Sequence, residues 1–183
     1  MFDLNALRCL PGPTYRVELD SPAGPLTALL SDAGVQALLW QTQRALCAGA
    51  IAALPTAEGH PVFEVLKHQI DVYFDRQLTS FHVPLDLHGT PFQKRVWALL
   101  QNIPFGETRT YGDLALMLGD ANLSRAVGAA NGNNPVSILV PCHRVIGSSG
   151  ALTGYAGGKE VKAFLLALEG VEVASVQMDL FGA

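Results

Sequence analysis

The spacing of apolar residues changes near residue 89, and this change limits the folds open to the chain. Before it, short apolar stretches such as Tyr15–Leu19 and Val35–Trp40 alternate with turn-forming residues, which is typical of an antiparallel meander. After it, apolar residues recur every three or four positions, as on the buried face of a helix. We therefore expect an α+β protein with an N-terminal domain at 1–88 and a C-terminal domain at 89–183.

The N-terminal domain is expected to be a small antiparallel-sheet α/β unit with a structural role. A helix should follow Pro61 and precede a short extended piece at residues 81–85. The apolar residues at helical spacing there are Phe63, Leu66, Ile70 and Phe74. The histidines of this part are scattered, without the spacing of ligands, at His60, His68, His82 and His88. No catalytic set can be recognised in this domain.

The C-terminal domain opens with two signals for helix starts. Thr90 and Gln93 form a Thr-x-x-Gln capping box, in which each side chain satisfies a free backbone N–H of the other residue. A second helix should follow Thr110, with Asp113 at its third position, and should stop at Gly119. We expect this domain to be mostly helical.

A third helix is expected from residue 123 through 131, after a tight turn. Two short helices joined in this way indicate a helix-turn-helix, and so a winged-helix-like domain. Small residues lie along the third helix at Ala126, Gly128, Ala129 and Ala130. Small side chains let a backbone approach another surface closely, which fits insertion into a DNA groove and equally fits close packing inside the protein.

The last elements expected are a strand and a helix. The apolar run Val136–Val140 predicts a buried strand that Pro141 ends. Lys159–Glu169 predicts a final helix, which Gly170 stops.

Cysteine usage indicates a reducing compartment rather than a disulfide framework. Cys9, Cys47 and Cys142 are an odd number of cysteines without a Cys-x-x-Cys spacing. We expect all three to be reduced, with Cys9 and Cys47 as small apolar core residues. No apolar run approaches the roughly 20 residues of a bilayer span, and the first ten residues do not resemble a secretory signal. A cytoplasmic protein without a membrane segment is expected.

Cys142 is followed by His143 and Arg144, and these three residues form the candidate site. A reactive thiol needs a proton acceptor and a positive field that favours the thiolate, which the two neighbours could supply. The chain must turn at Pro141 for Cys142 and His143 to cooperate. A bridging water, with a carboxylate behind the imidazole, would complete a proton relay, and Glu169 is the candidate carboxylate.

Chemistry alone leaves two other interpretations of Cys142 and His143 open. A cysteine hydrolase would also need an oxyanion hole and an acyl pocket, and neither can be identified in the sequence. A metal site would need two more ligands, but residues 89–183 contain no other Cys or His. We expect neither a metal nor a cofactor.

The net charge of −4 does not by itself suggest a protein that binds nucleic acid. Its distribution is more favourable, because residues 89–162 carry seven Lys or Arg against four Asp or Glu. An excess of this size is also typical of an ordinary solvated surface, so charge leaves DNA binding undecided.

The stretch Ser124–Ile146, with Pro-Cys-His-Arg at residues 141–144, closely resembles the O6-alkylguanine-DNA alkyltransferase family. Gly154–Gly158 and Leu165–Gly170 resemble it too, and the likeness runs from Thr90 to about Val171. The resemblance implies DNA repair by direct damage reversal. An alkyl group would move from O6-alkylguanine in double-stranded DNA to the Cys142 thiolate after base flipping, once per protein molecule. O4-alkylthymine is a second substrate to test, and we expect a monomer.

The resemblance also implies roles for single residues. The catalytic set would be Cys142, His143, Glu169 and Asn134. The substrate-binding set would be Tyr111, Val145, Tyr155, Ala156 and Lys162. The DNA-binding set would be Ser124, Arg125, Ala126, Ala129 and Tyr111, with Arg125 filling the place of the extruded base. Ala156 stands where some members carry Ser, so a side-chain donor to the guanine O6 is missing.

Two other function classes compete with repair. A lesion-sensing module similar to the alkyltransferase-like proteins would flip the base without chemistry, but such proteins replace the cysteine that is intact here as Cys142. A helix-turn-helix transcription regulator would bind particular sequences and ignore lesions.

Overall fold

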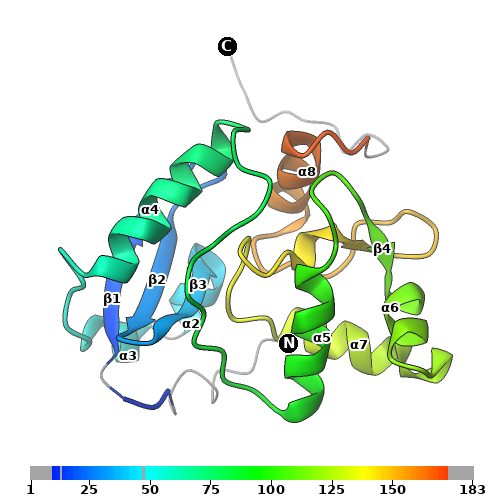
Figure 1. Cartoon of the computed structure of the whole chain (residues 1–183), viewed down its shortest axis with the longest axis horizontal. Helices are drawn as coiled ribbons and strands as arrows, with labels where there is room; N and C mark the ends of the chain where they lie inside the picture. The colour runs from blue at the N-terminus through cyan, green and yellow to red at the C-terminus, as the bar shows by residue number, and fades with distance from the viewer. Residues whose placement is uncertain (1–9, 13, 47, 173–183) are drawn as a thin grey trace.

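The computed structural model describes residues 10–12, 14–46 and 48–172. Figure 1 shows an N-terminal sheet with its long helix beside a mostly helical C-terminal part. The expectations for Cys9 and Cys47 lie outside the described residues. Within the described ranges, none of the helices combines the length and the apolar character that crossing a bilayer requires.

The N-terminal part is built on an antiparallel meander, which confirms the prediction. Strands β1 (Tyr15–Leu19), β2 (Leu26–Ser31) and β3 (Gly34–Trp40) are paired in the order β1-β2-β3. Every residue of β2 and β3 is buried, because both faces of the sheet are covered. Leu66 and Ile70 of helix α4 (Pro61–Phe74) pack in the core on one face. On the other face Ile51 packs with Leu29, Ala37 and Leu39.

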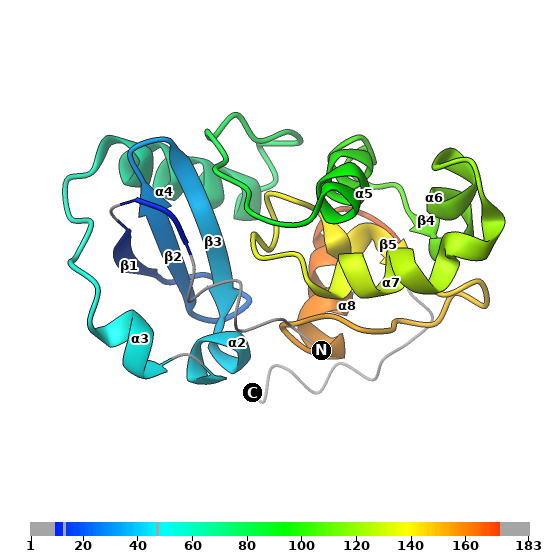
Figure 2. The same cartoon turned by 90° about the horizontal axis from the view of Figure 1, so that it is seen from below.

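Two short helices in this part were not predicted from the sequence. Helix α2 (Gln41–Leu46) follows β3 directly, and α3 (Ala48–Ala52) carries Ile51. Figure 2 shows α2 and α3 on the side of the sheet away from α4. The piece at residues 81–85 is extended, but it pairs only at Leu85, through a single parallel bridge to Val35.

The C-terminal part is mostly helical, as predicted. Its elements are α5 (Pro91–Gln101), β4 (Arg109–Thr110), α6 (Tyr111–Met117), η1 (Ala121–Leu123), α7 (Ser124–Gly132), η2 (Cys142–Arg144), β5 (Val145–Ile146) and α8 (Lys159–Leu168). The two capping boxes are present, with Gln93 N to Thr90 Oγ1 at 3.2 Å and Asp113 N to Thr110 Oγ1 at 3.1 Å. Helices α6 and α7 form the helix-turn-helix (Figure 2).

The prediction of a strand at residues 136–140 is wrong, although all five residues are buried. The backbone folds back there, with Val140 N donating to Val136 O at 3.1 Å. Ile138 adopts a φ of 69°, in the left-handed region that a β-branched residue rarely occupies. An apolar run reports burial alone, so it could not distinguish a buried turn from a buried strand.

This turn is attached to the free edge of β3. Leu38 N donates to Pro135 O at 2.9 Å, and Ser137 N donates to Leu38 O at 3.0 Å. An edge strand offers unpaired backbone groups, and here they hold the segment that leads to Cys142. One hydrophobic core therefore runs across both parts of the protein, from Leu38 to Val140.

Candidate active site

Cys142 begins the 3-10 turn η2, immediately after Pro141. The thiol residue is only 4% exposed, and its backbone N–H donates to Val140 O at 2.8 Å. The chain therefore turns at Pro141, as cooperation between Cys142 and His143 requires. The site lies on η2, between the buried turn of residues 136–140 and strand β5.

Glu169 is the centre of the hydrogen-bond network, one residue beyond α8. Its Oε1 accepts from His143 Nε2 at 2.8 Å, from the Tyr73 hydroxyl at 2.8 Å and from Arg144 Nη2 at 3.0 Å. Its Oε2 accepts from Arg144 Nε at 2.8 Å and from Gly106 N at 3.2 Å. Burial alone would raise the pKa of this carboxyl, but the hydrogen bonds and charges of His143 and Arg144 lower it to about 2.

His143 is fully buried, and one of its ring nitrogens, Nε2, bonds to Glu169. Burial lowers its pKa against the opposing effect of Glu169, so the imidazole is neutral at neutral pH. The carboxylate of Glu169 can only accept, which places the ring proton on Nε2. Nδ1 is therefore an acceptor, and it has no hydrogen-bond partner among the described residues. This is the tautomer that a general base for Cys142 needs.

Arg144 does not supply the positive field that the sequence suggested. Its guanidinium is held by Glu169, donates from Nη1 to Ile103 O at 2.6 Å and lies 5.9 Å from the centre of the Phe105 ring. The cation whose charge favours the thiolate is Lys162, from the buried face of α8.

Lys162 is fully buried and donates from Nζ to the carbonyls of Val145 and Thr153, the latter at 2.9 Å. Burial lowers its pKa to about 8, against the opposing effect of Cys142. Burial in turn raises the pKa of the Cys142 thiol, opposed by a hydrogen bond with Asn134 and by the charge of Lys162. The sulfur of the free protein is therefore a neutral thiol at neutral pH.

Asn134 braces the turn behind the cysteine. Its Nδ2 donates to Val140 O at 2.8 Å, and its Oδ1 accepts from Val136 N at 3.0 Å. The buried side-chain amide of Asn134 thus bonds to backbone groups at both ends of the turn. This contact offsets the strain at Ile138, since the side chain satisfies backbone groups that a strand ladder would otherwise have paired.

The segment with Tyr155 and Ala156 forms a second wall of the site. The Tyr155 ring lies edge-on to the His143 ring, with centroids 6.3 Å apart. Trp40 Nε1 donates to the Tyr155 hydroxyl at 3.1 Å, and Thr42 Oγ1 donates to Ala156 O at 2.6 Å. The N-terminal part therefore supports this wall directly.

Sequence reasoning missed Trp40 and Tyr73, two residues of the N-terminal part whose side chains bond to residues of the site. Neither residue belongs to a motif, and each side chain reaches its partner across more than 90 residues, 115 for Trp40 and 96 for Tyr73. Nothing in the local pattern marks them, because an aromatic residue at strand or helix spacing normally indicates only core.

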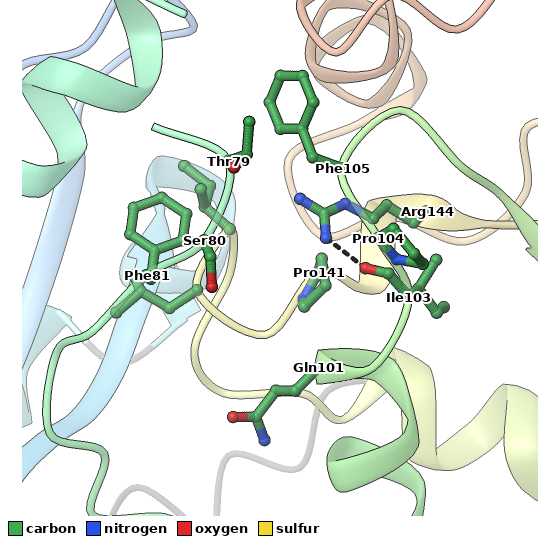
Figure 3. Close-up of a pocket in the computed structure, with 11 residues that line it drawn as sticks. Thr79, Ser80, Phe81, Gln101, Ile103, Pro104, Phe105, Pro141 and Arg144 are labelled. Carbon is green, nitrogen blue, oxygen red and sulfur yellow. Dashed lines mark hydrogen bonds between the residues drawn. The ribbon is translucent and has the colours of Figure 1, made fainter. Parts of the chain in front are cut away.

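At least two cavities lined by described residues border the site. One of about 280 Å³ is bounded by Tyr155 and Ala156 together with residues from α2 and neighbouring loops, namely Thr42, Gln43, Leu46, Gly132 and Gly154. Another, of about 590 Å³, lies between the two parts of the protein and is bordered by Phe81, Phe105, Pro141 and Arg144. Figure 3 shows the Arg144 guanidinium in this second cavity, bonded to Ile103.

The residues expected to contact DNA lie on the helix-turn-helix. Arg125, Ala126 and Ala129 are exposed on α7, while Ser124 at its start is half-buried. Tyr111, also half-buried, begins α6 and accepts from Thr153 Oγ1 at 3.3 Å. Tyr111 thus joins the helix-turn-helix to the segment that leads to Tyr155.

Comparison with known proteins identifies similar chains over most of this length. Two family models match, described as the 6-O-methylguanine DNA methyltransferase ribonuclease-like domain at residues 14–87 and the DNA binding domain at residues 91–171. A methylated-DNA–protein-cysteine methyltransferase of Mycobacterium bovis is 47% identical over 155 residues, covering 85% of this chain and 91% of that protein. The relative from Methanosarcina acetivorans is 54% identical over 113 residues, 62% of this chain and 72% of its own. The crystal structure of Mycobacterium tuberculosis OGT in complex with DNA aligns with a TM-score of 0.74 at 46% identity, covering 85% of this chain and 92% of that chain.

Proposed function

The chain belongs to the 6-O-methylguanine DNA methyltransferase family, and from this membership we propose how its own residues perform the repair. The protein repairs DNA by direct reversal, moving the alkyl group of O6-alkylguanine onto a cysteine of its own chain. We assign that role to Cys142. The observation that carries the assignment is the buried His143, next to Cys142 in the chain, which bonds through Nε2 to Glu169 and whose Nδ1 has no hydrogen-bond partner among the described residues.

The reaction begins with the thiol protonated. A water between Sγ and Nδ1 passes the thiol proton to His143, and Glu169 stabilises the imidazolium that forms. Lys162 and Asn134 favour the thiolate at the same moment. Entry of the extruded base excludes solvent around these charges, which strengthens both effects.

The sulfur then attacks the alkyl carbon in a displacement. A carbon–sulfur bond forms as the bond between carbon and O6 breaks, and guanine keeps the electron pair. The base regains a proton from the relay, so the thiol proton ends on guanine and His143 returns to its neutral form. The product is a thioether that no group of this site can cleave, so each molecule acts once.

Recognition of the base is assigned to the wall opposite His143. Tyr111 donates to the base and Tyr155 lines the pocket. Lys162 holds the carbonyls of Val145 and Thr153 and so fixes the backbone that reads the base edge. Because Ala156 has no hydroxyl, backbone N–H groups serve O6 as the charge develops.

Docking on double-stranded DNA is assigned to α7. Arg125 fills the space left by the extruded base. The small side chains of Ser124, Ala126 and Ala129 allow α7 to approach the groove closely. The DNA complex of the Mycobacterium tuberculosis relative supports this assignment. A monomer, a cytoplasmic location, the boundary between domains 1–88 and 89–183, and independence of metal and cofactor belong to the same proposal.

The test is a mass spectrum of the intact protein after incubation with a duplex that contains O6-methylguanine. One methyl group per chain should appear, on the peptide with Cys142. Cys142→Ala should take up none while still binding the lesion duplex. Methyl on another residue, or none on the wild type, contradicts the assignment. Equal affinity for lesion and unmodified DNA, with strong sequence preference, would favour a transcription regulator. O4-methylthymine duplexes tested in the same way define the substrate range.

A further inference from the structure

Tyr73 connects helix α4 of the N-terminal part to the carboxylate of the relay. Its ring is buried, and its hydroxyl donates to Glu169 Oε1 at 2.8 Å. The same oxygen accepts from His143 Nε2 at 2.8 Å. Burial and the neighbouring negative charge of Glu169 raise the pKa of this phenol, so it remains a donor at every working pH.

The ring that carries this hydroxyl is packed among aromatic neighbours. Its centroid lies 5.3 Å from that of Phe74, 5.1 Å from Phe81 and 6.2 Å from Phe105. Phe74 and Phe81 come from the N-terminal part, while Phe105 comes from the loop after α5. Contacts from these separate segments fix the ring, and therefore fix the point from which the hydroxyl reaches Glu169.

We propose that Tyr73 is a positioning residue for alkyl transfer, which holds the Glu169 carboxylate in the orientation that His143 needs and shares its Oε1 lone pairs with the imidazole. This inference rests on the proposed relay of Cys142, His143 and Glu169. It gives the N-terminal part a defined chemical task in the reaction, since that part contributes the hydroxyl.

Because Tyr73 and His143 share Oε1 of Glu169, the direction in which the pKa of His143 moves without the Tyr73 hydroxyl can be predicted. Oε1 accepts from Tyr73, His143 and Arg144, so each donor reduces the negative charge available to the other two. Without the phenol, Oε1 accepts more strongly from His143 Nε2, which stabilises the imidazolium and raises the pKa of His143. The other charged groups that act on His143 are Arg144 and Lys162, and both oppose protonation. Arg144 and Tyr155 are the further titratable groups that face the Tyr73 hydroxyl.

The experiment measures the single-turnover rate of methyl transfer from an O6-methylguanine duplex to the full chain, as a function of pH. Tyr73→Phe keeps the ring and removes the hydroxyl. We expect the acid limb of the profile to move to higher pH by about half a unit to one unit, because His143 must be neutral to accept the proton. The plateau rate above that limb should change less than about threefold.

Tyr15→Phe is the matched control, because it removes a phenol from the same part of the protein at a ring that packs on His60. Its acid limb should coincide with that of the wild type. A thermal melt of each variant sets a temperature at which all are folded. General loosening of the fold would lower the rate at every pH without moving the limb, and that result in Tyr73→Phe overturns the proposal.

A double-mutant cycle with Glu169→Gln separates this inference from the relay itself. The cycle is measured at a pH on the acid limb, where Tyr73→Phe alone should slow transfer about 3- to 10-fold. If Tyr73 acts through Glu169, Tyr73→Phe should change that rate less than about twofold in the Glu169→Gln background, so the two effects do not multiply. Independent, multiplying effects overturn the inference. A Glu169→Gln protein with the wild-type rate at all pH values would instead refute the relay. A slow Glu169→Gln protein with an unmoved limb in Tyr73→Phe would leave the relay standing and reject the role of Tyr73.

Discussion

The Trp40 indole nitrogen donates to the Tyr155 hydroxyl at 3.1 Å, which joins the last residue of β3 to the wall of the alkyl-transfer site. Trp40 is 3% exposed, so the bond is shielded from water. Strand β3 therefore holds both the turn that precedes Cys142 and the segment that contains Tyr155.

Trp40→Phe should lower stability and slow transfer. Loss of a buried indole and its hydrogen bond costs about 2–4 kcal/mol. The Tyr155 hydroxyl loses its donor, so transfer from O6-methylguanine should fall about 3- to 30-fold. Trp97→Phe is the control, because Trp97 also loses a buried donor, to Ala130 O at 2.9 Å, outside this wall. Chemical denaturation and single-turnover rates measure both variants. Equal slowing at matched stability loss would contradict a specific role for Trp40.

Stability in acid should depend on Glu169. Its pKa is about 2 in the folded protein against 4.5 as the ordinary value. A lowered pKa gives stabilisation that is complete above pH 4.5 and is lost as the pH falls towards 2, amounting to about 3 kcal/mol. Glu169→Gln should lack this component and leave Arg144 unpaired. Its free energy of unfolding should therefore be lower near pH 7, and the difference from the wild type should shrink towards pH 2. A constant difference across that range rules out the linkage.

Gly157→Ala should destabilise the protein because a Cβ there would lie 3.0 Å from the Trp40 ring. Overpacking of a buried contact of this kind costs about 1–3 kcal/mol. Gly49→Ala is the matched control, since a Cβ at Gly49 meets nothing within 4 Å and the residue lies within α3. That change should be neutral or stabilising by up to about 1 kcal/mol. Thermal melts compare the two variants. Equal melting temperatures would show that the Trp40 ring moves away from the new Cβ without a cost in stability.

Local signals in the sequence were enough to predict the meander, the helix starts at Thr90 and Thr110, and the general position of α7. Each depends on neighbours within a few residues, such as the contact of Thr90 with Gln93. The buried turn before Cys142 was not predictable, because its shape depends on Asn134 and on the edge of β3. That Lys162 rather than Arg144 supplies the charge that favours the thiolate was equally hidden, since charge identity says nothing about which partner a cation meets. The roles of the residues expected to contact substrate and DNA stay predictions.

Arg125→Ala should impair transfer from duplex DNA and spare transfer from a free base. The exposed Arg125 on α7 is proposed to occupy the gap left by the extruded nucleotide. Losing that substitute for stacking makes extrusion less favourable by about 1–3 kcal/mol, so transfer should slow about 5- to 150-fold. Free O6-methylguanine needs no extrusion and should react at the wild-type rate. Equal slowing with both substrates would place Arg125 in the chemistry or the fold instead.

Lys162→Met should raise the pKa of the Cys142 thiol. In the wild type, burial raises that pKa, while the hydrogen bond with Asn134 and the charge of Lys162 oppose the rise. Methionine fills a similar volume without charge, so one opposing influence disappears and the thiolate fraction at neutral pH should fall several-fold. The thiolate absorbance in the ultraviolet, compared between pH 6 and 8, where Lys162 still carries its charge, in a protein whose other cysteines are replaced by alanine, reports the change.

Lys159→Met is the control for this titration, because Lys159 is exposed at the start of the same helix. It should leave the thiol titration unchanged. Stability adds an independent check. The pKa of Lys162 is about 8 in the folded protein against 10.5 as the ordinary value, so between these values Lys162 binds more protons in the unfolded chain and its own contribution to stability rises with pH. The raised pKa of Cys142 acts with the opposite sign, so the contribution of Lys162 is obtained as the difference between the wild type and Lys162→Met. Lys162→Met should lose that rise. A thiol that titrates identically in Lys162→Met and wild type would show that the buried ammonium acts on the carbonyls of Val145 and Thr153 alone.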